Sequence, residues 1–412
     1  MPSAEPLERA RAAQGRGRTP LVVLFLTVFI DLLGFGIVIP FLPMYAARLQ
    51  IGAFGIGLVL AIYSLMQFLC APLLGRLSDH IGRRPVIMLG LLGSSLSYVI
   101  YGFAGSFGLL MLSRAVHGAC AGTVSTAQAY VADTTSESGR AHGMGMIGAA
   151  FGLGFVLGPA LGGLLGHSHL RVPVFFAAGL TFANLIFAAI ALPESHPADP
   201  GVELTWSCVI DPVLSLPRQL TSHRLSRWFT IAFLGTFAMA AFETTFALMV
   251  PRVYGYGAGG IGGLFAFAGL VQVFTQGYLL RKVVGRAGEP RLIRIGMVAF
   301  ALGMAPMASV ASHALLLILL ALLSAGYGLA NPSVASLISK YTARDLQGEV
   351  LGVNQSALSL ARIVGPILAG IGYEMLSPAA AYVGGGVAAL IAFALTGGAE
   401  AAPDARKERS PR

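Results

Sequence analysis

The sequence predicts an all-α membrane protein with 12 transmembrane helices, arranged as two pseudo-symmetric six-helix bundles. Of its 412 residues, 56% are hydrophobic and 11% are charged, whereas soluble domains carry about 25% charged residues. Twelve apolar runs are each long enough to cross a hydrocarbon core of about 30 Å. We place them at about 20–46, 54–75, 85–105, 107–131, 142–165, 172–192, 227–250, 258–280, 291–311, 313–338, 348–373 and 378–398. A weak internal repeat relates the first six runs to the last six.

The first run could be mistaken for a signal peptide because four Arg precede it. Its apolar stretch is too long for that and contains Asp31, so we expect a retained span.

The positions of Lys and Arg predict the orientation. The two tails and alternate connections hold 22 of the 27 basic residues, and the opposite connections hold only Arg48, Arg171 and Arg252. Because basic residues concentrate on the cytoplasmic side, we expect both termini there, in a plasma (inner) membrane protein. The net charge of +9 then reflects topology and contact with anionic lipid, and no nucleic-acid partner is implied.

One long polar segment, 193–226, separates the spans six and six. We therefore expect a cytoplasmic N-tail (1–19), a first bundle (20–192), a cytoplasmic linker (193–226), a second bundle (227–398) and a cytoplasmic C-tail (399–412). The linker either forms a short amphipathic surface helix or is irregular.

The repeat appears in two places. GFVLGPALGG at 154–163 recurs as ARIVGPILAG at 361–370, and 277–296 is a degenerate echo of 75–90 without its acid. Repeated halves with a substrate site at the membrane midplane are typical of secondary transporters.

The segment GRLSDHIGRRP, residues 75–85, is dense in Gly and charge, and we expect a tight loop. From spacing alone it is either a hinge whose charges contact neighbouring helix ends or a solvated basic turn.

This segment resembles the G-x-L-x-D-x-x-G-R-R signature loop of the major facilitator superfamily. The matching residues are Gly75, Leu77, Asp79, Gly82, Arg83 and Arg84. Arg114 with Gly118 in span 4 and GLGFVLGPALGG at 152–163 in span 5 resemble further motifs of the 12-helix drug and proton antiporter branch. DLLGFGIVIPFLP at 31–43 is similar to the first span of tetracycline efflux proteins.

The resemblance implies roles for these segments. The loop would act in gating, with Arg83 bridging to Asp133 and Asp79 lying near the start of span 11, around 348–351, to hold the outward-open state. The antiporter motif would suppress leakage; its residues are Gly154, Gly158, Pro159, Gly162 and Gly163. The small residues of span 5 independently predict close helix packing, and Pro159 favours a kink.

Four ionisable side chains lie within spans: Asp31, Arg114, Glu243 and Arg362. A charge in hydrocarbon costs at least about 2.5 to 3.5 kcal/mol, so each is a functional candidate. At a rise of about 1.5 Å per residue, Asp31 lies roughly 16 Å into its span, where a carboxylate can couple a proton to transport. Arg114 cannot carry the proton itself but can act on a neighbouring acid. The alternatives are a structural carboxylate for Asp31 and helix gluing for Arg114.

Glu243 and Arg362 either line the substrate cavity from the second half or form an internal ion pair. We add Asp31, Gln128, Asn331 and Gln355 to the predicted cavity, although lone amides often only bridge helices.

Enzyme chemistry is not predicted. The sequence contains no H-E-x-x-H, Walker A or G-x-S-x-G motif, so we expect no catalytic residue, no metal and no cofactor. Three Cys (70, 120 and 208) have no metal-site spacing. We expect a monomer that uses a proton gradient to export tetracycline-like or other amphipathic compounds. The alternatives are export of a sugar, metabolite or lysolipid, or a scaffold or receptor that has lost transport.

Overall fold

The structure is a computed structural model that describes residues 19–135, 137–167, 169–196, 225–342 and 347–397. Within these residues every regular element is a helix. Twelve helices are long and apolar enough to cross a membrane, as predicted. The tails and most of the 193–226 linker, including its possible amphipathic helix, lie outside the described residues.

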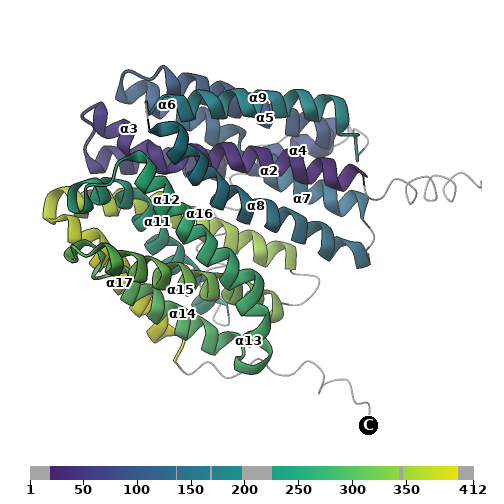
Figure 1. The fold of residues 1–412 in the computed structure, drawn as a ribbon. Coiled ribbons are helices and arrows are strands. Elements are labelled where there is room, and N and C mark those ends of the chain that lie inside the picture. The colour runs from purple at the N-terminus through teal and green to yellow at the C-terminus, as the bar shows by residue number, and fades with distance from the viewer. Residues whose placement is uncertain (1–18, 136, 168, 197–224, 343–346, 398–412) are drawn as a thin grey trace, which may run out of the picture. The chain divides into compact units, whose positions relative to one another are not determined.

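The first half contains six spans (Figure 1). Its elements are α2 (Thr19–Val38), η1 (Ile39–Phe41), α3 (Leu42–Arg48), α4 (Ala53–Ile81), α5 (Arg83–Gly102), α6 (Phe107–Cys120), α7 (Thr123–Thr134), α8 (Glu137–Gly166) and α9 (Val172–Ala191). Span 1 consists of α2, η1 and α3. Pro40 lies in the 3₁₀ segment η1 and Pro43 in the first turn of α3, and each lacks the backbone N–H that a continuous α-helix would use. Span 4 consists of α6 and α7.

The second half contains the other six spans. Its elements are α11 (Ser226–Tyr254), α12 (Ala258–Phe274), η2 (Thr275–Leu279), α13 (Leu280–Ala287), α14 (Glu289–Met304), η3 (Met307–Ser309), α15 (His313–Lys340), α16 (Gln347–Ile371), η5 (Gly372–Leu376) and α17 (Pro378–Leu395). The elements η2 and η5 are π-helical segments that continue spans 8 and 11.

Helix pairing is the same in both halves, which is the structural form of the internal repeat. In the first half α2 packs on α8 and α9, and α5 packs on α6 and α9. In the second half α11 packs on α16 and α17, and α14 packs on α15 and α17. Adding six to each span number converts one set of pairs into the other.

Contacts divide the chain into two compact units. Unit 1 comprises Met1–Ile51, Ile62–Ile210 and Tyr256–Ala266, and unit 2 comprises Gly52–Ala61, Asp211–Gly255 and Phe267–Arg412. The start of α4 belongs to unit 2, where the backbone N–H of Phe54 donates to Glu374 Oε2 at 2.9 Å.

The expectation of a loop at 75–85 is wrong for most of its length. Helix α4 continues through this segment to Ile81, and α5 begins at Arg83. Only Gly82 lies between them, with a φ of 102° that favours glycine. The repeat has the same break, because Gly288, with a φ of 72°, separates α13 from α14. The helices therefore extend past the apolar runs from which their ends were predicted.

The glycines of α8 allow a close approach to α2. A Cβ added at Gly158 would lie 2.6 Å from the backbone carbon of Gly36, and one at Gly162 would lie 2.6 Å from the carbonyl oxygen of Ile37. The predicted close packing is therefore present, with span 1 as the partner. Helix α8 is continuous through Pro159.

Candidate functional site

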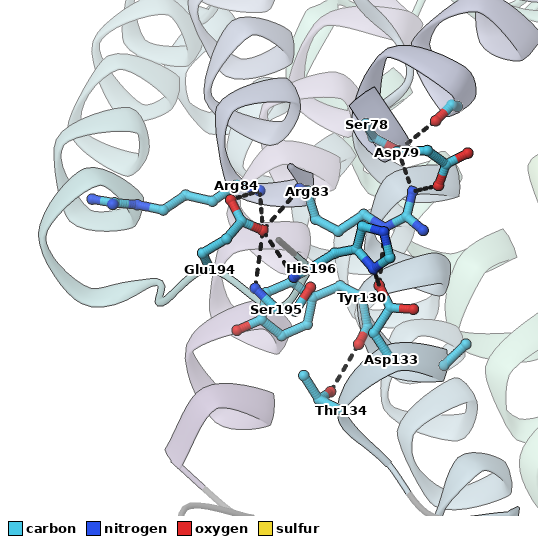
Figure 2. A network of polar contacts seen from close by, with 12 residues as sticks. Ser78, Asp79, Arg83, Arg84, Tyr130, Asp133, Thr134, Glu194, Ser195 and His196 are labelled. Carbon is cyan, nitrogen blue, oxygen red and sulfur yellow. Dashed lines mark hydrogen bonds and ion pairs between the residues drawn. The ribbon is translucent and has the colours of Figure 1, made fainter. Parts of the chain in front are cut away.

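Arg83 is the centre of a polar network at the end of unit 1 that carries the signature segment (Figure 2). Its guanidinium lies 2.5 Å from Asp79 Oδ1 on α4 and 3.0 Å from Asp133 Oδ2 on α7, and it donates to Ser78 Oγ at 2.5 Å. The Arg83 side chain is only 8% exposed, so it relies on these partners. The ion pair expected between Arg83 and Asp133 is present.

Glu194, which sequence reasoning did not identify, holds the start of α5. Its carboxylate accepts hydrogen bonds from the backbone N–H of Arg83 at 2.8 Å and of Arg84 at 3.2 Å. It also accepts from the backbone of Ser195 and His196 just after it (Figure 2). Arg83 is a cation at a helix N-terminus, which the helix dipole disfavours, and the Glu194 anion offsets this. The sequence did contain a signal for this role: an acidic residue three positions after the end of α9, on the side of the membrane where basic residues concentrate.

Unit 2 has a counterpart of the Arg83 pair with the charges exchanged. Glu289, the first residue of α14, forms an ion pair with Lys340, the last residue of α15. Arg83 and Asp133 occupy the corresponding ends of spans 3 and 4. Here the anion lies at a helix N-terminus and the cation at a C-terminus, which both dipoles favour. The Lys340 side chain is 53% exposed, so this pair is the more solvated of the two.

Asp31, on α2, lies deep in unit 1 and is half-buried. It is near Thr123 of α7 and Tyr98 of α5, and no described cation forms an ion pair with it. Tyr98 is fully buried. The predicted coupling acid is thus close to hydroxyl groups and unneutralised.

Arg114, on α6, is 2% exposed and lies over two tyrosine rings. Its guanidinium carbon is 5.8 Å from the ring centre of Tyr98 and 5.1 Å from that of Tyr101. Its Nε donates to Ser113 Oγ at 3.4 Å, whereas Nη2 has no hydrogen-bond partner. No described carboxylate pairs with it. Arg114 is therefore a buried cation held mainly by aromatic faces.

His117, one helical turn after Arg114, was missed as a site residue although the spacing places both on one helix face. Its ring is 4% exposed and lies against Phe35, Tyr63 and Tyr98 at centroid distances of 5.8, 5.1 and 4.9 Å. We call Asp31, Tyr98, Tyr101, Arg114 and His117 the unit 1 polar cluster.

Several buried polar atoms of this cluster have no hydrogen-bond partner among the described residues: the hydroxyls of Tyr98 and Tyr101, Arg114 Nη2 and His117 Nδ1. Buried polar groups in native proteins are nearly always hydrogen-bonded, so each of these atoms needs a water molecule or a ligand group as its partner. The cluster can therefore hold a proton at a carboxylate and receive an acceptor group at a guanidinium.

In unit 2, Glu243 of α11 and Arg362 of α16 are close enough to interact electrostatically, and Tyr327 of α15 lies near both. Both charged side chains are half-buried. Among the described residues, however, no ion pair joins them. The two side chains are thus neighbours without a direct ion pair.

The predicted amides differ in environment. Asn331 is half-buried, whereas Gln128 and Gln355 are exposed. Asn354, beside Gln355, is 8% exposed and its Oδ1 has no partner, so it was the stronger candidate in that turn. In the described part of the chain, no group of three or more His, Cys, Asp or Glu could hold a metal ion.

The chain belongs to the major facilitator superfamily of membrane transporters, whose family profile matches residues 24–366 and 282–412. It is 33% identical over 371 residues to the class C tetracycline resistance protein of Escherichia coli, covering 86% of this chain and 89% of that protein. It is 28% identical over 361 residues to multidrug resistance protein 1 of Bacillus subtilis (strain 168), covering 86% and 90%.

A solved structure of similar sequence is that of the human organic anion transporter TETRAN. It has 28% sequence identity to this chain and a TM-score of 0.69, and the match covers 92% of this chain and 99% of that one. The expected fold and family are thereby confirmed, and the protein is a multi-pass integral membrane transporter of this superfamily.

Proposed function

We propose that this transporter exports amphipathic, drug-like compounds, tetracyclines among them, in exchange for protons. The observation that carries the proposal is Asp31, a half-buried carboxylate deep in a membrane bundle to which no cation of the described residues is paired. Such a group is expensive to keep charged and is therefore suited to exchanging a proton. The names of the tetracycline and multidrug resistance relatives support export of such compounds.

In this proposal the unit 1 polar cluster is the coupling site. Asp31 binds the proton, and Arg114 stays charged and interacts with the substrate or with the ionised acid. Glu243, Arg362 and Asn331 contribute polar groups from unit 2 to the substrate cavity, together with Gln128 and Gln355. Two halves that rock about this cavity expose it to each side in turn.

We further propose a plasma-membrane protein with both termini in the cytoplasm, two six-helix domains joined at 193–226 and a monomeric state. Asp79 near the start of span 11 would complete a cytoplasmic latch with Arg83 and Asp133. The glycines of the α8 motif would seal the path against α2. The proton gradient would be the energy source, with neither an enzymatic activity nor a cofactor.

The test is transport by the purified protein in proteoliposomes. A compound panel that includes tetracycline is measured with and without a pH gradient, together with substrate-induced proton release. Asp31→Asn should abolish gradient-driven export because an amide cannot take up a proton, whereas Asp31→Glu should retain part of it. Unchanged proton release in Asp31→Asn would remove Asp31 from the mechanism.

A second candidate is export of organic anions. It is favoured by Arg114, a buried cation that pairs with no acidic side chain in the described part of the chain, and by the similarity to the human organic anion transporter. Paired anionic and cationic dyes of similar size distinguish the two candidates. Preference for the anionic dye that is lost in Arg114→Gln would favour anion export.

A further inference from the structure

A cavity of about 530 Å³ lies in unit 1 at the end remote from the signature segment. It is formed where α3 ends and α9 begins, and it is lined by Tyr45, Arg48, Leu49, His169, Leu170, Arg171, Val172 and Phe175. Its volume is in the range of ligand pockets, about 300 to 1,000 Å³. Arg48 is 17 residues beyond Asp31 in the same span, or about 25 Å along a helix, so this cavity is distinct from the polar cluster.

The cavity gathers basic side chains that form no ion pair with any described residue. Arg48, His169 and Arg171 are exposed, and none of the ion pairs among the described residues includes them. The unit 1 stretches that build this end, 40–51, 99–112 and 160–180, contain no Asp or Glu, and Glu374, which bonds to Phe54 just after the first stretch, belongs to unit 2. Only three basic residues of the whole chain are predicted for this side, and two of them share this cavity.

The α9 terminus adds to the positive potential. Helix α9 begins at Val172, one of the lining residues, so the positive end of its dipole is at the cavity. An anion is therefore the complementary ligand.

Two apolar residues of the lining are exposed at the surface. Val172 is 39% exposed and Phe175 is 37% exposed. Phe175 packs edge-on against Phe103 at 5.1 Å, and Phe103 is itself 69% exposed. Phe103 directly follows the end of span 3 and Phe175 lies in the first turn of span 6, so both rings are at the end of a membrane-spanning helix. Tyr45 closes the floor, since it is buried and its hydroxyl donates to the Ala104 carbonyl at 2.8 Å.

We propose that this cavity binds an anionic phospholipid from the adjacent leaflet. Arg48 and Arg171 donate hydrogen bonds to the headgroup phosphate, and an acyl chain lies along Val172 and Phe175. A lipid is favoured over a free phosphate because four of the eight lining residues are Leu, Val or Phe, and two of these, Val172 and Phe175, are exposed.

The test is native mass spectrometry of the full-length protein titrated with phosphatidylglycerol or with phosphatidylcholine. Charge-assisted hydrogen bonds to phosphate predict that Arg48→Gln and Arg171→Gln each weaken binding of one phosphatidylglycerol by about tenfold. The double variant should bind one lipid fewer than the parent at the same concentration. Phosphatidylcholine should bind this site at least about tenfold more weakly, because its net charge is zero.

Arg252→Gln is the matched control, because Arg252 is the third basic residue of this side but stacks on Tyr373 in unit 2. It should leave the Arg48-dependent lipid bound. Melting temperatures check that each variant is folded. If the double variant does not fold, the two single variants are sufficient to test the lipid site. The proposal is overturned by an unchanged lipid count in the folded arginine variants, by equal binding of phosphatidylcholine, or by complete displacement with millimolar inorganic phosphate.

Discussion

Asp79 and Asp133 both form ion pairs with the buried Arg83 guanidinium. Replacing both should therefore lower the free energy of unfolding by more than the sum of the two single effects. The Asp133 side chain is 23% exposed and its ion pair spans 3.0 Å. This lies between a surface pair, worth about 0 to 1 kcal/mol, and a buried one, whose disruption costs about 3 to 5 kcal/mol. We therefore expect Asp133→Asn to lower the free energy of unfolding by about 1 to 2 kcal/mol. Asp79 is 40% exposed, and Asp79→Asn should cost about 0.5 to 1 kcal/mol.

In the double variant the guanidinium, only 8% exposed, keeps hydroxyl but no carboxylate partners. The free energy of unfolding should fall by about 3 kcal/mol or more. Denaturant titration in mixed micelles measures this free energy for the two single variants and the double variant. Adding Arg83→Gln to the double variant should recover part of the loss, because the unpaired charge is then gone. Lys340→Gln is the matched control, since it breaks the more exposed counterpart pair and should cost less than about 1 kcal/mol. Additivity of the two Asp variants within about 0.5 kcal/mol would refute the shared-cation reasoning.

Three further outcomes are expected. Glu194→Gln should destabilise the start of α5 by about 1 kcal/mol and speed amide exchange there, because it removes a capping anion; unchanged exchange at that turn would contradict the capping role. Glu243→Gln and Arg362→Gln should show a coupling of about 0.5 to 1.5 kcal/mol in unfolding free energy, because the two residues interact without a direct ion pair and share Tyr327 as a neighbour. Recovery of most of the stability in the double variant would instead indicate a direct pair. Gly158→Ala should lower the free energy of unfolding by about 1 to 3 kcal/mol, because the added Cβ would clash with the backbone of α2. Gly148→Ala is the control, because a Cβ there meets nothing within 4 Å, and it should be neutral or slightly stabilising. Equal changes in melting temperature for the two variants would argue against the close approach of α8 to α2.

Span number and the repeat followed from the sequence because a membrane imposes a length and an apolar composition on each helix. The ends of the helices did not follow from the sequence, because a helix can continue beyond the hydrocarbon core wherever its residues allow helical backbone. At 75–81 an interior Gly did not stop α4, and the backbone turned only at Gly82. The glycine spacing of span 5 predicted close packing, but not that α2 is its partner.

The sequence by itself determined which residues are costly in a membrane, since the desolvation of Asp31, Arg114, Glu243 and Arg362 depends mainly on depth along a span. It also indicated the contact of Arg83 with Asp133, through a family motif. Only the tertiary structure decided which groups face these charges, because such neighbours come from helices far apart in the chain. Glu194 reaches α5 across 111 residues, and Tyr98 of α5 is near both Asp31 of α2 and Arg114 of α6. Arg48 and Arg171 likewise line one cavity only because α3 ends beside the start of α9. The positive potential that they create together depends on their distance in space and not on their separation in the sequence.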